Sequence, residues 1–180
     1  RNLSAVQDSA ALVVVVDNFA LGHPAGDLME AEADLLVADL ALVEKRMERL
    51  RKESRRDSPE HAALERARAA LEDDRPLRTA DVPESDRRLL RAYSLHTLRP
   101  LMVVSNRGDE PAAEETELRE MCEERGAALL PIDAAFELEL TELPEEEHGE
   151  FLESMGYRAS GLDRLISAAY GTLDLVTFFT

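Results

Sequence analysis

The chain has 180 residues, of which 38 are Asp or Glu and 21 are Lys or Arg, so its formal net charge is −17. This acidic balance argues against broad, nonspecific binding of nucleic acid, while the length suffices for one domain, with or without an appendage. A single cysteine, Cys122, excludes an internal disulfide framework, and no apolar run is long enough to span a membrane. We therefore expect a cytoplasmic protein.

Residues 2–9 have the pattern of the end of a helix. The first predicted strand follows and covers residues 12–16. Its unbroken run of β-branched residues is typical of a strand covered on both faces in a parallel sheet. Asp17 at its end is either a metal or catalytic carboxylate or a loop cap, and the pattern favours the cap. Because the chain begins with Arg1 and enters structure almost at once, we expect a piece of a longer protein.

A long helix is predicted from Asp27, as its N-cap, to about Arg55. Its apolar residues recur at steps of four and three, the spacing of a helix that packs along a partner: Leu36, Leu40, Val43, Met47 and Leu50. Ser58 and Pro59 begin a second helix with the same spacing at Leu64, Ala67 and Leu71. The two helices predict an antiparallel hairpin, a coiled-coil arm over 27–82, between segments 1–26 and 83–180.

The arm carries seven basic residues within twelve positions: Lys45, Arg46, Arg49, Arg51, Lys52, Arg55 and Arg56. One interpretation is a solvated helix face, which is what charge runs usually are. The other is a positive tip that binds RNA or an acidic protein. The pattern alone slightly favours the solvated face.

After the arm, helices and strands alternate along the chain. We predict a helix over 89–98, a strand over 101–105, a helix over 112–125 and a strand over 127–132. Two further helices follow, over 144–155 and over 161–170, the second with Leu162, Leu165 and Ile166 on its inner face, and the apolar 173–180 favours a strand. This alternation predicts an α/β fold with a parallel sheet flanked by helices.

Polar residues follow both of the later strands, at 106–110 and at 133–136. Ligands of open α/β sheets bind at the carboxyl ends of the strands, so these loops can lie side by side around a small molecule. Asn106 offers a donor and an acceptor, and Asp109 offers acceptors, which suits the edge of a nucleotide base. Taken alone, N-x-x-D favours an ordinary turn over a base site.

No other chemistry stands out. The four histidines are scattered without a nearby cysteine, which makes a zinc site unexpected, and Cys122 lies among acidic residues that disfavour its thiolate. The sequence contains no G-x-x-x-x-G-K-[ST] phosphate loop. We therefore predict no metal-binding or catalytic residue in these 180 positions.

Four segments together resemble a known family in their order and spacing: 27–40, 98–102, 130–138 and 161–180. They contain Leu-Val-Ala-Asp-Leu, Leu-Arg-Pro, Pro-Ile-Asp-Ala-Ala-Phe-Glu-Leu and Gly-Leu-Asp-Arg-Leu-Ile, respectively. They are similar to the entry to the helical arm, a strand entry, the fifth nucleotide motif and the lead-in to the C-terminal TGS domain of the Obg-like ATPases of the YchF type. That family belongs to the translation-factor class of P-loop NTPases.

The resemblance implies that 1–26 and 83–180 are parts of the later half of a nucleotide-binding domain and that 27–82 is its inserted arm. The parent protein would bind and hydrolyse ATP or GTP with magnesium and work with ribosomes. Its phosphate loop, first switch and metal-side motif would precede Arg1, and its TGS domain would follow Thr180, so this piece alone would be inactive.

The resemblance also implies roles for seven residues. Asn106 would brace the base, Arg107 and Gly108 would form the loop backbone, and Asp109 would accept from the base edge. Backbone contacts from the fifth motif would come from the run Asp133, Ala134 and Ala135.

Two departures from the family pattern leave alternatives open. The family normally carries N-x-x-E, with a preference for ATP, whereas Asn106 and Asp109 form N-x-x-D, closer to the guanine-reading N-K-x-D of ordinary GTPases. The stretch after Phe19 is also shorter, and Asp17 stands where the family usually has a basic residue. The base therefore stays undecided between adenine and guanine. The alternative function is a nucleotide-free module that binds a protein or a ribosomal partner through the arm.

Overall fold

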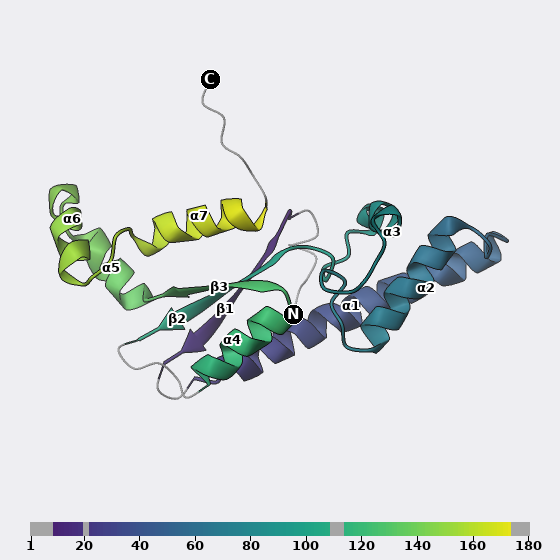
Figure 1. Ribbon diagram of the computed structural model, residues 1–180, viewed down its shortest axis with the longest axis horizontal. Coiled ribbons are helices and arrows are strands. Elements are labelled where there is room, and N and C mark those ends of the chain that lie inside the picture. Colours follow the sequence, from purple (N-terminus) through teal and green to yellow (C-terminus); the bar gives the residue numbers. More distant parts are fainter. Residues whose placement is uncertain (1–8, 20–21, 109–113, 174–180) are drawn as a thin grey trace, which may run out of the picture. The chain divides into compact units, whose positions relative to one another are not determined.

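The computed structural model describes residues 9–19, 22–108 and 114–173 (Figure 1). The chain divides into two compact units, each with its own interior. The arm unit comprises Arg1–Leu12, Met29–Leu101 and Glu123–Ala127, and the sheet unit comprises Val13–Leu28, Met102–Cys122 and Ala128–Thr180.

A three-stranded parallel sheet forms the centre of the sheet unit, in the order β1-β2-β3 (Figure 1). The strands, and the helices that follow them, are β1 (Leu12–Asn18), β2 (Leu101–Arg107), α4 (Glu115–Glu124), β3 (Ala127–Ile132), α5 (Ala134–Glu142), α6 (Glu145–Ser154) and α7 (Gly161–Thr172). The strands, α4, α6 and α7 confirm the predicted alternation, while α5 was not predicted. Its start is set by Asp133, whose side chain caps the first turn.

Burial differs sharply between β1 and β2. The middle strand β2, which has a neighbour on each edge, is buried at every position from Leu101 to Ser105. The prediction that the first strand is covered on both faces is wrong, since Val13 is 53% exposed and Val15 is 65% exposed. In this chain β1 is an edge strand with one face packed and the other facing solvent.

The predicted hairpin is formed by α1 (Pro24–Lys52), which belongs to the arm unit from Met29 on, and α2 (Pro59–Glu72), and Figure 1 shows α2 folded back along α1. Their shared core contains Leu36, Val43, Met47, Leu50, Ala63, Leu64, Ala67, Ala70 and Leu71. Ser58 caps α2 by accepting a hydrogen bond from the His61 amide at 3.2 Å. The predicted N-cap of the first helix was wrong: α1 begins at Pro24, whose fixed φ suits the first helical position.

The segment after the arm is less helical than predicted. It contains α3 (Glu84–Leu90) and the short 3-10 helix η2 (Arg91–Tyr93), so the helix expected over 89–98 stops early. Ser94 has a φ of 52°, which ends the helical path. Beyond it, the carboxylate of Asp39, on α1, accepts hydrogen bonds from the backbone amides of His96 and Thr97 at 2.8 and 2.7 Å.

The predicted inner face of α7 is wrong for Leu162, which is 63% exposed, and for Ile166, which is 47% exposed, while Leu165 is half-buried. The helix end predicted over 2–9 and the strand predicted over 173–180 lie almost entirely outside the described residues. Cys122 is buried on α4, in keeping with a structural thiol. Among the described helices, none is long and apolar enough to cross a membrane.

Candidate nucleotide-base site

Asn106 links the ends of β2 and β3. It is the last residue but one of β2, and its Oδ1 accepts a hydrogen bond from the Ala134 amide at 3.2 Å, at the start of α5. The two polar segments predicted to lie side by side are therefore in direct contact. Asn106 is half-buried, so its amide group remains within reach of a ligand above the strand ends.

Asp133 organises the start of α5. Its Oδ1 accepts hydrogen bonds from the amides of Ala135 and Phe136, both at 3.0 Å, which satisfies two of the unpaired donors at a helix start. The amides of Ala134 and Ala135 thus both have acceptors within the protein. A base contact by either amide has to replace the hydrogen bond that it already makes.

Arg107 and Gly108 continue from Asn106 to the edge of a hollow. The Arg107 guanidinium lies 3.4 Å from Glu115 at the start of α4. A Cβ added at Gly108 would lie 3.2 Å from the Cβ of Phe19, which is closer than most such contacts. A side chain at position 108 would therefore push against the Phe19 side chain. Asp109, the predicted base-edge acceptor, lies outside the described residues.

A cavity of about 300 Å³ opens beside these residues within the sheet unit. It is lined by Arg107, Gly108, Pro131, Ile132, Asp133, Met155, Tyr157 and Arg164. Three of the predicted site residues therefore share one cavity. Met155, Tyr157 and Arg164 were not predicted to line the site. They come from the segment around the α6–α7 connection and from α7, and no motif spacing ties them to Asn106.

Polar groups at the end of β1 also lie close to β2. The buried Asn18 donates from Nδ2 to Ser105 Oγ at 2.8 Å, which joins the two strands one residue before Asn106. Asp17, whose metal or capping role was left open, is an exposed residue within β1 rather than in a loop.

Just before α1, His23 Nδ1 lies 3.0 Å from Glu114 Oε1. The hydrogen bond to Glu114, together with its charge, raises the pKa of His23 above 6.5. In turn, the hydrogen bond from His23 lowers the pKa of Glu114 below 4.5, helped by the backbone amides of Ala25 and Gly26.

No group of three or more His, Cys, Asp or Glu side chains within 9–19, 22–108 and 114–173 is arranged to hold a metal ion. The histidines lie apart: His61 and His96 are buried in the arm unit, and the His148 ring contacts the Leu143 carbonyl oxygen.

The basic cluster of the arm is partly neutralised by its own neighbours. Arg46 and Arg55 both pair with Glu60, at 2.7 and 2.9 Å, and i,i+4 pairs join Arg49 to Glu53 and Lys52 to Glu48. The described residues provide no ion-pair partner for the other three cluster members, Lys45, Arg51 and Arg56. Four of the cluster members line a groove of about 680 Å³: Lys45, Arg46, Arg49 and Lys52, beside Leu42, Glu48, Ala92 and Tyr93.

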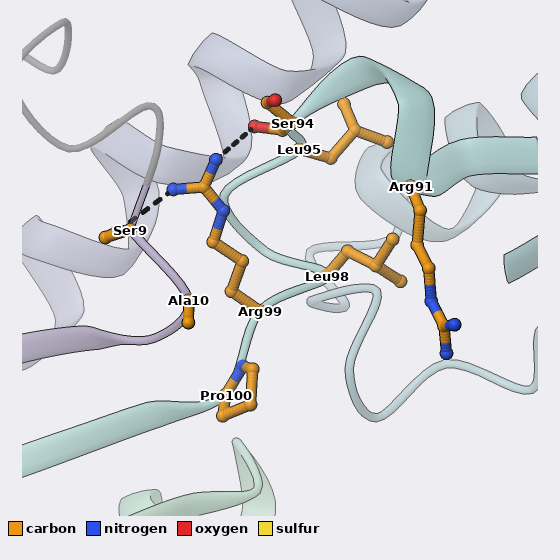
Figure 2. Close-up of a pocket in the computed structure, with 8 residues that line it drawn as sticks. All are labelled: Ser9, Ala10, Arg91, Ser94, Leu95, Leu98, Arg99 and Pro100. Carbon is orange, nitrogen blue, oxygen red and sulfur yellow. Dashed lines mark hydrogen bonds between the residues drawn. The ribbon is translucent and has the colours of Figure 1, made fainter. Parts of the chain in front are cut away.

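A third hollow, of about 560 Å³, lies in the arm unit and contains none of the predicted site residues. Figure 2 shows Arg99 at its centre, donating to Ser9 Oγ at 3.2 Å and to the Ser94 carbonyl oxygen at 3.1 Å. The Arg99 guanidinium holds the walls of this hollow together, while Arg91 extends from the opposite wall.

Comparison with known proteins gives consistent matches. The chain is 32% identical over 165 residues to the ribosome-binding ATPase YchF of Pasteurella multocida. The match covers 88% of this chain and 46% of that protein. It is 32% identical over 167 residues to the ribosome-binding ATPase YchF of Bacillus subtilis, covering 87% of this chain and 46% of the relative. The chain thus spans about half the length of these curated relatives.

A solved structure of the Schizosaccharomyces pombe YchF GTPase matches with a TM-score of 0.84 and 25% identity, covering 95% of this chain and 52% of that chain. No model of a known protein family matches the sequence. The predicted α/β fold and the resemblance inferred from the four sequence segments are confirmed.

Proposed function

Since the chain belongs to the Obg-like ATPase family of the YchF type, we propose that it supplies the base-recognition part of a nucleoside-triphosphatase that binds and hydrolyses ATP or GTP. The observation that carries this proposal is the hydrogen bond between Asn106 and Ala134, which joins the two base-site segments beside a cavity. In this proposal, Asn106 and Asp109 read the base, Arg107 and Gly108 form the loop backbone, and the run Asp133, Ala134 and Ala135 supplies backbone contacts.

The proposed division of labour follows from what the sequence contains. Segments 1–26 and 83–180 would form part of the nucleotide-binding domain, and 27–82 would be an inserted arm. Because the 180 residues contain no G-x-x-x-x-G-K-[ST] segment, the phosphate cradle would come from elsewhere in the full-length protein. The same holds for magnesium ligands, and the 180 residues alone are expected to be inactive.

The nucleotide proposal is tested by equilibrium binding of fluorescent ATP and GTP analogues to the full-length protein and to an Asn106→Ala variant. We expect at least one nucleotide to bind, and the variant to weaken binding and to lose discrimination between the two bases. Glu117→Ala, an exposed change on α4, serves as a matched control that leaves binding unchanged. If the intact protein binds neither nucleotide, the nucleotide proposal fails and the nucleotide-free interaction module becomes the proposed function.

A second proposed function is partner binding through the arm, because its basic groove includes a lysine without an internal ion pair. The names of the relatives make the ribosome the partner to test, and in this proposal the protein works in the cytoplasm. The three unpaired residues, Lys45, Arg51 and Arg56, are the ones that can give their full charge to RNA phosphates or to acidic side chains. The remaining four would first have to leave Glu48, Glu53 or Glu60.

Co-sedimentation with ribosomes tests this surface. We expect the triple change Lys45→Glu, Arg51→Glu and Arg56→Glu to abolish co-sedimentation and the salt dependence of binding. The matched control reverses three exposed charges outside the arm: Arg88→Glu, Arg119→Glu and Arg158→Glu. Equal binding by both variants and the wild type would mean that the cluster is a solvated face.

A further inference from the structure

We infer that the connection between α6 and α7 forms a wall of the nucleobase site and that Tyr157 is its stacking surface for a purine base. This inference rests on the proposed function, which it extends by adding base-contacting residues that lie outside the two predicted segments. Tyr157 lies 51 positions after Asn106, but both belong to the sheet unit.

The cavity itself joins the two regions. Its lining includes Arg107 at the end of β2, Gly108 just after it and Asp133 after β3, together with Met155, Tyr157 and Arg164 from the α6–α7 region. A volume of about 300 Å³ is at the lower end of small-molecule pockets, so the cavity suits a base rather than a whole nucleoside triphosphate. The sugar and phosphates would then extend outside it.

The Tyr157 ring is held in place before any ligand arrives. Its centroid lies 5.0 Å from that of Phe136, which in turn stacks on Phe151 at 5.1 Å with an interplanar angle of 9°. The Arg164 guanidinium lies over the Tyr157 ring, 5.9 Å from its centroid. A ring fixed on two sides loses little conformational entropy when a base packs against it.

The wall is also fastened to β3 and α5. Arg164 donates from Nη2 to the Pro131 carbonyl oxygen, and the Gly161 amide donates to Glu137 Oε1 at 2.6 Å. A Cβ at Gly161 would lie 2.8 Å from the Glu137 carboxyl, so the start of α7 is in close contact with α5. These contacts keep the α6–α7 connection beside Pro131, Ile132 and Asp133.

The chemistry of the wall suits a flat, polarisable ligand. Tyr157 is 36% exposed and Met155 is 58% exposed, so both side chains are partly open to a ligand. Bases stack on aromatic rings and on guanidinium planes, and a larger purine gains more from such contact than a pyrimidine. Stacking tolerates any base, so Tyr157 is expected to serve ATP and GTP alike and to leave base selection to Asn106 and its neighbours.

The test compares wild type, Tyr157→Ala, Tyr157→Phe and Arg158→Ala in the full-length protein, by equilibrium binding of ATP, GTP and UTP. We expect Tyr157→Ala to weaken ATP and GTP binding by about fivefold or more, by a similar factor for both, with a smaller loss for UTP. Tyr157→Phe keeps the ring, and Arg158→Ala changes an exposed neighbour that does not line the cavity, so both should bind as the wild type does.

Unchanged purine binding by a folded Tyr157→Ala variant overturns the inference while the proposed function stands. If the intact protein binds no nucleotide, the proposed function fails as well. Should Tyr157→Ala not fold, the wild type still decides: with labelled tyrosines, the Tyr157 ring signal, assigned through Tyr157→Phe, should shift when ATP or GTP is added. Absence of a shift in nucleotide-saturated protein overturns the inference.

Discussion

Asn106 shows how one side chain can serve structure and binding at once. Its Oδ1 accepts from the Ala134 amide, and in the proposed function its Nδ2 group supplies the donors for the base. The same hydrogen bond fixes the start of α5 relative to β2. A substitution here therefore acts both on the ligand and on the loop that carries Asp133.

His23 and Glu114 give the site region a titratable pair. The raised pKa of His23 means that its contribution to stability is fully present below pH 6.5 and is lost as pH rises through the folded pKa. The lowered pKa of Glu114 means that its contribution is present above pH 4.5 and is lost as pH falls through the folded pKa. The pair thus stabilises the fold most fully between these two ordinary values.

We predict that the Glu114→Gln substitution returns the pKa of His23 towards 6.5, because the hydrogen-bonded charge is removed. An NMR titration of the His23 ring protons measures this directly. Glu120→Gln, an exposed change on α4, should leave the titration as in the wild type. A wild-type His23 that titrates at or below 6.5 would contradict the pairing.

At the scale of elements, Asp39 explains why the chain after η2 leaves the helix. One carboxylate oxygen lies 2.8 and 2.9 Å from the His96 amide and Nδ1, and the other lies 2.7 Å from both the Thr97 amide and Oγ1. All of these groups are buried. Both Asp39 oxygens have their donors, and a buried set of hydrogen bonds of this kind specifies one backbone path from Ser94 towards β2.

We predict that Asp39→Asn lowers the free energy of unfolding by about 3 kcal/mol, since an amide nitrogen would face donors that need an acceptor. Urea unfolding followed by circular dichroism measures the change. Asp57→Asn alters an exposed residue at the hairpin turn and should shift stability by no more than about 0.5 kcal/mol. Equal stability of the two variants would show that the Asp39 network does not hold this segment.

Glu32 and Arg78 form a second buried contact in the arm unit. Their side chains are 3% and 6% exposed, Arg78 Nη2 donates to Glu32 Oε1 at 2.6 Å, and Arg78 Nε donates to the Arg125 carbonyl oxygen at 2.7 Å. We predict that Arg78→Met costs about 3 to 5 kcal/mol, because it leaves a buried carboxylate without a partner. The double variant Glu32→Leu with Arg78→Met should regain part of that loss in urea unfolding. A double variant less stable than Arg78→Met alone would contradict this.

The elements that sequence patterns predicted well are those with a local cause. The steps of three and four in α1 and α2 match their shared core, and Ser58 marks the start of α2. The covered face of β1 could not be predicted, because an apolar run does not state whether both faces have neighbours. The non-helical path at 96–97 depends on Asp39, which is more than fifty positions away in the sequence.

At the scale of the whole molecule, the residues of the candidate site also divide into those that local sequence patterns predicted and those that depend on tertiary contacts. The sequence predicted Asn106 and the run from Asp133, because both follow strands, and parallel strand ends meet at one edge of a sheet. It could not predict Tyr157 and Arg164, whose place at the cavity depends on tertiary contacts with Phe136 and Pro131. Asp109 lies outside the described residues, and its role as a base-edge acceptor remains a prediction.

The most direct test of the central claim, that this chain carries the base site, is photolabelling of the full-length protein with 8-azido-ATP and 8-azido-GTP, followed by mass spectrometry. We predict labelled peptides that contain 106–109, 133–135 or 155–157, and loss of that label when unmodified nucleotide is added in excess. Specific label confined to the arm, 27–82, or no nucleotide-protected label within these 180 residues, would contradict the account.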